Sequence, residues 1–485
     1  MTEKDNIPDY RSMEEFDVKY SMKVMLILAG LVMIVMYIEG MLTPSLLSIE
    51  ETFGINTAQA SLILSLYMVG GVAATPVVGK LGDLYGKKKV LILILIIYAV
   101  SVSVTGFSPN YYFMLASRTI QGTGMSVMPL GMALVREEFP REMIPKAQAI
   151  ISAMFGAGFA VSLPLGSLVS NDFGWRWTYH SAIPVIALLV LVSFLVIKES
   201  RFRKENVRID FVGAVLLAIT LSLFVLALSE GNTWGWASTL TLGLVIAGLA
   251  VTIPLTIYEL RYSRAGRDPI LNFRLLAIRN VMVGNIILSL AGLGMFLAMF
   301  GLIFRFEYVF FANTSNYILN SGLSMVPFAL GTIIFGPIAG VLVTRTGIKP
   351  MAALGAIVAS AGFVLQATLP DYTLTLVYEF ITGAGLSLMN GTLINFIVLT
   401  VDPRDMGLAT GMNGTFRSLG SSVGPPIAGS ILTAYAINTI PTGTAFSYTF
   451  LVAGLVFIVA AALVAFGNEV LGKGRSLKDA RKQMM

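Results

Sequence analysis

Long stretches of apolar residues, separated by short polar or charged segments, recur along almost the whole chain. An α-helix needs about 20 apolar residues to cross the ~30 Å hydrocarbon core of a bilayer. The stretches do not alternate between apolar and polar positions over about 10 residues, as the strands of an outer-membrane barrel do. The pattern therefore predicts an all-α integral membrane protein. Fourteen transmembrane helices are expected, near residues 22–43, 57–79, 90–106, 111–135, 143–170, 177–197, 211–229, 238–258, 280–304, 318–343, 350–369, 372–396, 405–434 and 446–466.

The 33 Lys and Arg residues are distributed unevenly between the loops. An even number of spans puts both termini on one side of the membrane, and loops rich in Lys and Arg stay in the cytoplasm. With cytoplasmic termini, only Arg176 and Arg305 fall in external loops, whereas Arg118 and Arg417 fall inside helices. Residues 1–21 hold six carboxylates and no apolar core, so we expect no signal peptide. We predict a multi-pass protein of the plasma membrane with both termini in the cytoplasm.

Composition excludes several classes of chemistry. Charged residues make up 12% of the 485 positions, about half of the ~25% usual in globular proteins, and hydrophobic residues make up 56%. The absence of Cys and the single His180 exclude iron–sulfur clusters and Cys- or His-cluster metal sites, so no metal or cofactor is expected. No GxxxxGK[ST] loop occurs, which excludes ATP hydrolysis through a P-loop. The net charge of +6 reflects membrane topology and does not predict nucleic-acid binding.

The chain also repeats itself at a constant offset of 261 residues. Because three separate anchors share one offset, the second to fifth predicted helices are expected to correspond to the tenth to thirteenth. Parallel repeats of this kind are typical of two-bundle secondary transporters, whose substrate path runs between the bundles. The anchors are Gly79–Gly86 with Gly340–Gly347, Gly122–Gly124 with Gly383–Gly385, and Pro164 with Pro425.

Two predicted spans, near 211–229 and 238–258, are left over by the repeat and would form an inserted pair. The chain is accordingly divided into five parts. These are a cytoplasmic tail (1–21), a first six-helix bundle (22–197), a linker with two extra helices (198–279), a second six-helix bundle (280–466) and a basic cytoplasmic tail (467–485).

The loop between the second and third predicted helices has the pattern Gly-x-Leu-Gly-Asp-x-x-Gly-Lys-Lys. Its glycines permit a tight turn and close helix approach, and Asp83 is expected just before the third helix, where a carboxylate can satisfy free N–H groups. An ordinary turn with topology-setting lysines is the alternative. The pattern resembles the most diagnostic loop of the major facilitator superfamily. That resemblance implies a latch on the cytoplasmic gate, made of Gly79, Asp83, Gly86, Lys87 and Lys88.

Arg118 lies within the fourth predicted helix, where a charged side chain costs at least about 2.5 kcal/mol and normally has a partner. Arg118, Gln121 and Met125 share one helical face. The segment resembles the family's R-x-x-Q-G-x-G element, which implies that Arg118 takes part in proton coupling. A buried structural ion pair is the alternative.

Glu39 is the one acid inside the first predicted helix, at a depth similar to that of Arg118. A Glu39–Arg118 pair is therefore expected, in which burial beside Arg biases the carboxylate while leaving it titratable. The family's first helix usually carries Asp in a D-x-T pattern, which would fall on Ile38. We interpret Glu39 as the protonation or cation site.

In the second half, Glu379 occupies the repeat position of Arg118 with the opposite charge. Glu379 and Arg417 either form a mutual structural pair or act in transport and proton coupling. Asn390, Asn395 and Asn413 are further candidates for the polar lining of a cavity.

The fifth predicted helix carries a partial version of the family's antiporter element G-x-x-x-G-P. Gly158 and Pro164 are present, whereas Leu163 replaces the glycine before the proline. The repeat copy retains Gly420, Gly424 and Pro425. Glycines at i, i+4 let helices approach closely and proline adds a kink. The resemblance implies a kinked seal against the leak that would uncouple antiport.

Three further stretches resemble the fourteen-helix drug:proton antiporter branch: Trp175–Trp177, Ser229–Trp236 and Asp210–Gly213. Interfacial aromatic belts would also explain the two Trp-rich ones. The resemblance extends from about residue 22 to 466.

The resemblance implies a secondary transporter, not an enzyme, that works by alternating access. Proton entry through Glu39, modulated by Arg118, would drive efflux of a lipophilic, cationic compound from a monomer in the lipid bilayer. Met41, Met125 and Met299 would give the adaptable lining that promiscuous binding needs. One alternative is a transporter of a single defined solute, such as an amino acid, sugar or siderophore. Another is a membrane scaffold or sensor without transport, which buried charge disfavours.

Overall fold

The computed structural model describes residues 17–140, 143–199, 209–267, 269–398, 400–401 and 406–469. Most of the two predicted tails and of the charged loop near 198–210 therefore lie outside the described residues. Helices account for nearly all of the described chain, as the apolar pattern predicts.

The first half is built from long helices joined by short turns. Its elements are α1 (Val18–Gly40), η2 (Thr43–Ser45), α2 (Leu46–Phe53), α3 (Thr57–Tyr85), α4 (Lys87–Gly106), α5 (Tyr111–Gln121), η3 (Gly122–Ser126), α6 (Val127–Glu138), α7 (Ile144–Phe173) and α8 (Trp175–Val196). The span predicted near 111–135 is not one continuous α-helix, because the 3₁₀ segment η3 interrupts it. A Cβ added at Gly122 would lie 2.2 Å from the Tyr67 carbonyl oxygen, so this segment packs directly on α3.

The second half follows an inserted helix pair. The elements are α9 (Phe211–Trp234), α10 (Thr239–Arg264), α11 (Phe273–Leu276), α12 (Arg279–Arg305), the π-helical turn η4 (Phe306–Phe310), α13 (Tyr317–Ser324), α14 (Val326–Thr346), α15 (Ile348–Ala367), α16 (Tyr372–Val398), α17 (Met406–Ala434), β1 (Ala436–Ile437), β2 (Ile440–Pro441) and α18 (Gly443–Val464). The span predicted near 318–343 is split at Met325, just before Pro327. The antiparallel β1–β2 hairpin was not predicted from the apolar pattern.

Ten of the helical segments in the described chain are long and apolar enough to cross a membrane. The other four predicted spans coincide with α5–η3–α6, α7, α16 and α17. The number of membrane crossings stays a prediction, whereas the all-helical membrane architecture is confirmed.

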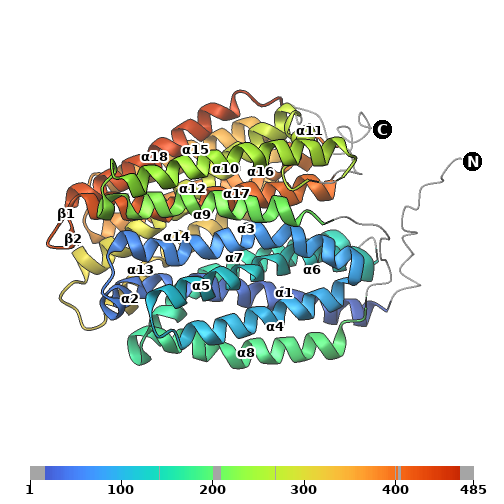
Figure 1. The fold of residues 1–485 in the computed structure, drawn as a ribbon, viewed down its shortest axis with the longest axis horizontal. Helices are drawn as coiled ribbons and strands as arrows, with labels where there is room; N and C mark the ends of the chain where they lie inside the picture. Colours follow the sequence, from blue (N-terminus) through green and yellow to red (C-terminus); the bar gives the residue numbers. More distant parts are fainter. Residues whose placement is uncertain are drawn as a thin grey trace, which may run out of the picture.

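The long helices run side by side along the long axis of the molecule, with α1, α4 and α8 on one side of the view and α15, α17 and α18 on the other (Figure 1). Each half has its own buried apolar core. The two halves meet where α3 packs on α17 and α7 packs on α13. Helix α9 lies against both α3 and α17, and α10 packs on α9. The inserted pair is thus attached beside the line where the halves meet.

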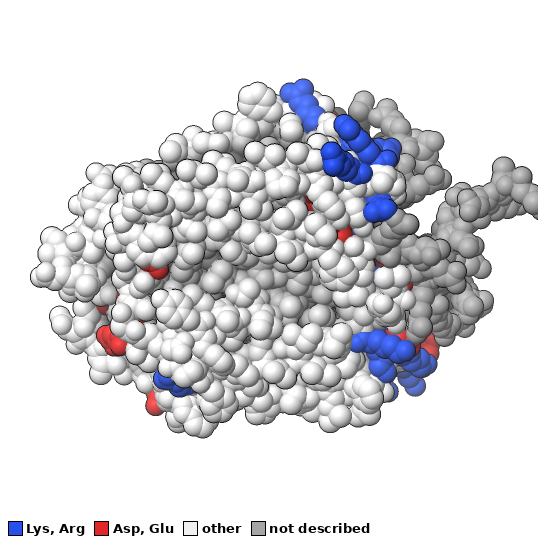
Figure 2. All heavy atoms as spheres, in the orientation of Figure 1, with Lys and Arg blue, Asp and Glu red and all other residues white. Residues whose placement is uncertain are grey.

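The two ends of the bundle differ in charge. We call the end where α1 begins and α18 ends the terminal end. At this end the start of α1 is tied to the end of α6, because Ser21 Oγ donates to the Glu138 carbonyl oxygen at 2.9 Å. Figure 2 shows Lys and Arg side chains gathered mostly at this end. The opposite end, which holds α2, η4 and the β1–β2 hairpin, is called the distal end (Figure 1).

Candidate functional site

A cavity of about 60 Å³ lies between the two halves of the molecule. Its walls come from α1, α3, η3 and α7 of the first half and from α12, α16 and α17 of the second. The lining residues are Met36, Glu39, Met68, Met125, Phe159, Ala291, Gly292, Met295, Phe296, Asn390, Arg417, Ser418 and Ser421. Four predicted site residues therefore meet here, namely Glu39, Met125, Asn390 and Arg417.

The cavity brings one acid and one base together from opposite halves. Glu39 is 6% exposed, and its Oε2 has no hydrogen-bond partner among the described residues. Of the two arginines that attract Glu39, Arg417 acts more strongly than Arg118. The Oδ1 atom of Asn390 is also buried without a hydrogen-bond partner in the described chain. These polar atoms are available to a proton or a ligand in the cavity.

Most of the remaining lining is apolar, and it includes flexible Met side chains. Phe159 and Phe296 face each other from the two halves, with ring centroids 6.2 Å apart in an edge-on arrangement. Four Met side chains complete the apolar wall. Thioethers and aromatic rings adapt to ligands of different shape, because Met is flexible and polarizable and aromatic rings offer broad contact area.

Sequence reasoning missed most of this lining. Met36, Met68, Met295 and Phe296 stand in stretches that are apolar on every face, so no periodicity separates cavity-facing residues from lipid-facing ones. The i, i+4 spacing of Arg417 and Ser421 on one face of α17 was an available signal.

Arg118 does not form the expected ion pair with Glu39. Its Nε donates to the Ile63 carbonyl oxygen at 3.1 Å, and its Nη1 donates to Gln121 Oε1 at 3.4 Å. The guanidinium lies over the Tyr67 ring, 4.6 Å from the centroid. Arg118 and Gln121 are both fully buried inside the first half, and neither lines the cavity. The Ile63 carbonyl oxygen and the Tyr67 ring therefore interact with the guanidinium in place of the Glu39 carboxylate that we expected.

Glu379 and Arg417 do not pair with each other either. Glu379 is fully buried, and the cation that acts on it is Arg305, in the last turn of α12. We expected Arg305 in an external loop, but it is 2% exposed. It donates to O and Oε1 of Gln366 at 3.2 and 3.1 Å, and to the Pro370 carbonyl oxygen at 2.6 Å. Arg305 and Glu379 both lie within the second half and outside the cavity.

The glycines of α7 lie at its contact with α1. A Cβ added at Gly158 would lie 2.4 Å from the Met33 carbonyl oxygen, and one at Gly166 would lie 2.4 Å from that of Met41. Pro164 stands inside α7. Met41 is fully buried at this contact, so the prediction that it lines the cavity is wrong.

The repeat-related pair α12 and α17 is packed in the same way. A Cβ added at Gly420 would lie 1.7 Å from the Ser289 carbonyl oxygen, and one at Gly424 would lie 2.5 Å from that of Leu293. Pro425 stands inside α17. Close approach of the glycine-bearing helices is confirmed, while their role as an antiport seal stays a prediction.

Other predicted lining residues lie elsewhere. Met299 is buried in the core of the second half. Asn413 Nδ2 donates to Asn285 Oδ1 at 3.0 Å. The side chain of Asn395 lies outside what the structure describes. Within the described residues, no group of three His, Asp or Glu side chains could hold a metal ion.

The predicted gating loop is a turn at the terminal end. Gly86 has φ +102°, which permits the tight turn, whereas a Cβ added at Gly79 would meet no atom within 4 Å, so the expected close approach is absent there. Asp83 lies in the last turn of α3 and not at the start of α4. The N-cap of α4 is Gly86, so no side chain caps that helix. The Lys88 ammonium lies over the Phe194 ring, 5.4 Å from its centroid.

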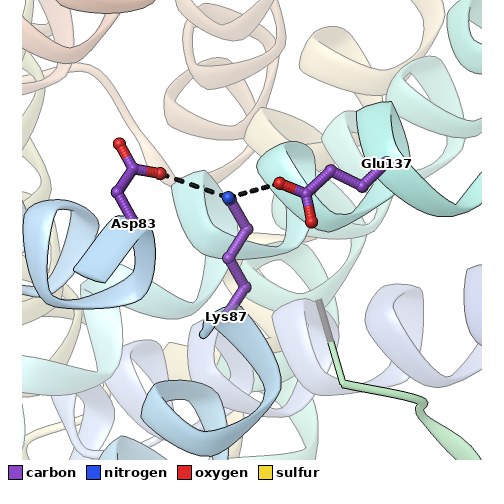
Figure 3. Close-up of polar contacts among 3 residues, drawn as sticks. All are labelled: Asp83, Lys87 and Glu137. Atoms are coloured by element: carbon purple, nitrogen blue, oxygen red, sulfur yellow. Dashed lines mark hydrogen bonds and ion pairs between the residues drawn. The ribbon is translucent and has the colours of Figure 1, made fainter. Parts of the chain in front are cut away.

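Lys87 occupies the centre of this turn. Its Nζ pairs with Asp83 Oδ1 at 3.2 Å and with Glu137 Oε1, so one ammonium ties together α3, α4 and α6 (Figure 3). The sequence indicated an acid and a base in this loop, but Glu137 comes from a distant segment that sequence spacing could not relate to it.

We expect Lys87→Met to destabilise the first half, because it leaves two carboxylates without the ammonium between them. A loss of about 1–3 kcal/mol is expected, between the values for exposed and buried ion pairs. The matched variant Lys88→Met removes an adjacent ammonium that lies only over an aromatic ring. Thermal unfolding of the purified variants measures the difference. Equal melting temperatures for the two would contradict the structural role of Lys87.

Comparison with known proteins gives a consistent assignment. The family model described as "Major Facilitator Superfamily" matches residues 28–306 and 287–482. Multidrug resistance protein 3 of Bacillus subtilis (strain 168) is 25% identical over 416 residues, which cover 82% of this chain and 80% of that protein. Multidrug transporter protein MdtP of the same organism is 27% identical over 383 residues, 78% of this chain and 69% of that protein.

A solved structure is also similar in fold. The crystal structure of the nucleoside transporter NupG matches with a TM-score of 0.64 at 16% identity, and the match covers 91% of this chain and 98% of that one. At this level of identity the similarity concerns the fold alone, and it does not extend to the substrate.

Proposed function

This chain belongs to the Major Facilitator Superfamily, and we propose that it is a proton-coupled exporter of lipophilic, cationic compounds from the fourteen-helix drug:proton antiporter branch. The observation that carries the proposal is the carboxylate of Glu39, with an unbonded oxygen, in a cavity walled by Met and Phe side chains. The two Bacillus subtilis relatives, which are named multidrug proteins, support efflux.

The proposed exchange rests on competition for one carboxylate. A lipophilic cation gains contact with the Met and Phe wall and attraction to ionised Glu39. A proton that neutralises Glu39 removes that attraction. The cavity therefore binds either the cation or the proton, but not both at once. When neither the cation nor the proton is bound, Arg417 attracts the ionised Glu39. This attraction matters because an uncompensated carboxylate is costly in the membrane interior.

The proposed orientation places the terminal end in the cytoplasm and the distal end outside the plasma membrane. The gathering of Lys and Arg at the terminal end supports it, because cytoplasmic segments are enriched in these residues (Figure 2). Alternating access would then move the halves of a single monomer about the cavity.

A second candidate is transport of one defined polar solute. Arg417, Ser418, Ser421 and Asn390 form a polar wall on the second half, which favours a ligand with an anionic or hydroxyl-bearing group. For such a solute the attraction would come from Arg417, and Glu39 would be secondary.

The test uses proteoliposomes that hold a pH-sensitive dye and carry an imposed proton gradient. We expect tetraphenylphosphonium to drive proton movement in the wild type, and we expect Glu39→Gln to abolish it. Glu379→Gln is the matched control, since it removes a buried carboxylate that is outside the cavity, and it should retain the movement.

Loss of coupling in Glu379→Gln with retention in Glu39→Gln would move the proton site to Glu379. Absence of any response in the wild type to a panel of lipophilic cations, with a response to amino acids or sugars, would favour the second candidate.

A further inference from the structure

Two glutamates from opposite halves lie buried at the distal end, outside the cavity described above. Glu50 lies in α2, the short helix that follows α1 and η2, and Glu307 lies in η4, the π-helical turn that extends α12. Their side chains are 6% and 1% exposed. The Tyr308 hydroxyl, next to Glu307, donates to Glu50 Oε2 at 3.4 Å and so joins the two halves.

Each carboxylate has hydrogen bonds on only one of its oxygens. Thr57 Oγ1 also donates to Glu50 Oε2, at 3.4 Å, and Ser321 Oγ donates to Glu307 Oε1 at 3.3 Å. Glu50 Oε1 and Glu307 Oε2 are buried without a hydrogen-bond partner among the described residues. An ionised carboxylate in this position is costly, whereas a protonated one carries no charge and can donate.

The surrounding groups do not compensate the charge. Glu51 on α2 and Glu50 both act repulsively on Glu307, and the other titratable groups nearby are the phenols of Tyr308 and Tyr317. Within the part of the chain that the structure describes, neither Glu50 nor Glu307 forms an ion pair with a Lys or Arg. Two carboxylates that share a site without a cation repel each other unless a proton neutralises one of them.

The carboxylates lie beside the contact that closes the distal end. Ser321, which bonds Glu307, belongs to α13, and α13 packs tightly on α7 of the other half. A Cβ added at Gly322 would lie 2.3 Å from Ser167 Oγ. π-Helical turns such as η4 are rare and are found frequently at functional sites. A change of charge on Glu307 therefore acts directly on this inter-half contact.

We propose that Glu50 and Glu307 form a proton-binding site that holds the distal end closed while one of them is protonated, and that loss of the proton separates the halves by repulsion. This site is distinct from Glu39 and requires neither a known substrate nor a known direction of transport. Its failure would leave the proposed efflux untouched, because the experiment below measures accessibility in the absence of substrate.

The chain lacks Cys, so a single introduced cysteine reports on one position. Ser167→Cys places a thiol in the α7–α13 contact, where Ser167 is fully buried, and Ser315→Cys places one at an exposed distal position. The ratio of their labelling rates with a membrane-impermeant maleimide corrects for the pH dependence of the labelling reaction, and the Gln variants below, which carry the same buried thiol, control for the ionisation of that thiol. Full-length protein in nanodiscs is labelled across a pH series, with Glu50→Gln, Glu307→Gln and the matched control Glu51→Gln.

In the wild type we expect the ratio to rise about tenfold from acidic to alkaline pH, because a carboxylate pair in an apolar site keeps its proton above the ordinary range of a carboxyl group and releases it as the pH rises further. Glu51→Gln, which changes an exposed neighbour, should retain the rise. Glu50→Gln and Glu307→Gln should hold the ratio low at every pH, because the neutral amide imitates the protonated acid. The two Gln variants are assessed separately. If one of them fails to fold, the labelling ratio of the other still tests the proposal.

Three results would overturn the proposal. One is a flat ratio in the wild type across the series. Another is a rise that persists in a folded Gln variant. The third is closure at high pH by added Na⁺ or K⁺, with choline as control, which would make the pair a metal-cation site and not a proton site.

Discussion

Gly420→Ala is expected to prevent normal packing of α12 against α17 and to cost about 3 kcal/mol or more, at the upper end of the range for overpacked interiors. The added Cβ would lie 1.7 Å from the carbonyl oxygen of Ser289, and the next nearest atoms, at 2.6 and 3.0 Å, also belong to the Ser289 backbone. A backbone in the middle of a helix cannot rotate away as a flexible side chain can. The two helices must therefore move apart, and their extensive contact is lost.

Gly414→Ala is the matched control, because Gly414 lies on the same helix and a Cβ added there would meet no atom within 4 Å. Alanine has a higher helix propensity than glycine, so this variant is expected to gain up to about 1 kcal/mol. Thermal unfolding of both purified variants in detergent measures the contrast. Equal melting temperatures would show that the close approach at Gly420 does not stabilise the protein.

Arg305→Met is expected to destabilise the second half by about 3–5 kcal/mol, because loss of a charged donor leaves several buried acceptors unsatisfied at roughly 1–3 kcal/mol each. The change leaves the carbonyl oxygens of Gln366 and Pro370 without their donor. It also removes the cation that attracts Glu379, and neither Glu379 oxygen has a hydrogen-bond partner in the described chain.

A double-mutant cycle separates the two causes. Adding Glu379→Gln to Arg305→Met removes the carboxyl group that has lost its nearby cation, so the double variant should be more stable than Arg305→Met alone. Arg176→Met is the control at the same distal end, where a partly exposed guanidinium donates to the Ser108 carbonyl oxygen at 3.3 Å, and it should cost at most about 1 kcal/mol. Melting temperatures of the wild type, the two single variants, the double variant and the Arg176→Met control test this. Strictly additive losses would contradict an attraction between Arg305 and Glu379.

The sequence alone was enough to predict the architecture, since the solvent constrains it so strongly. A bilayer requires about 20 apolar residues for each helical crossing, and these runs are visible without any tertiary information. The internal repeat predicted two corresponding halves, and the glycines at Gly420 and Gly424 predicted where helices approach closely. The presence of charge inside predicted helices placed Glu39 and Arg417 among the candidates, and both line the cavity.

Only the tertiary structure decided which charges meet. Counting along a helix gives the depth of Glu39, Arg118 and Arg417 in the membrane, but it does not give the direction in which each side chain points or the helix that it faces. Glu39 and Arg118 have similar depths, yet Arg118 donates to a carbonyl oxygen and lies over an aromatic ring. Glu39 is attracted more strongly by Arg417 than by Arg118. These partners come from helices far apart in the chain, so their pairing depends on how the helices pack. An apolar stretch does not show which of its residues faces which neighbouring helix.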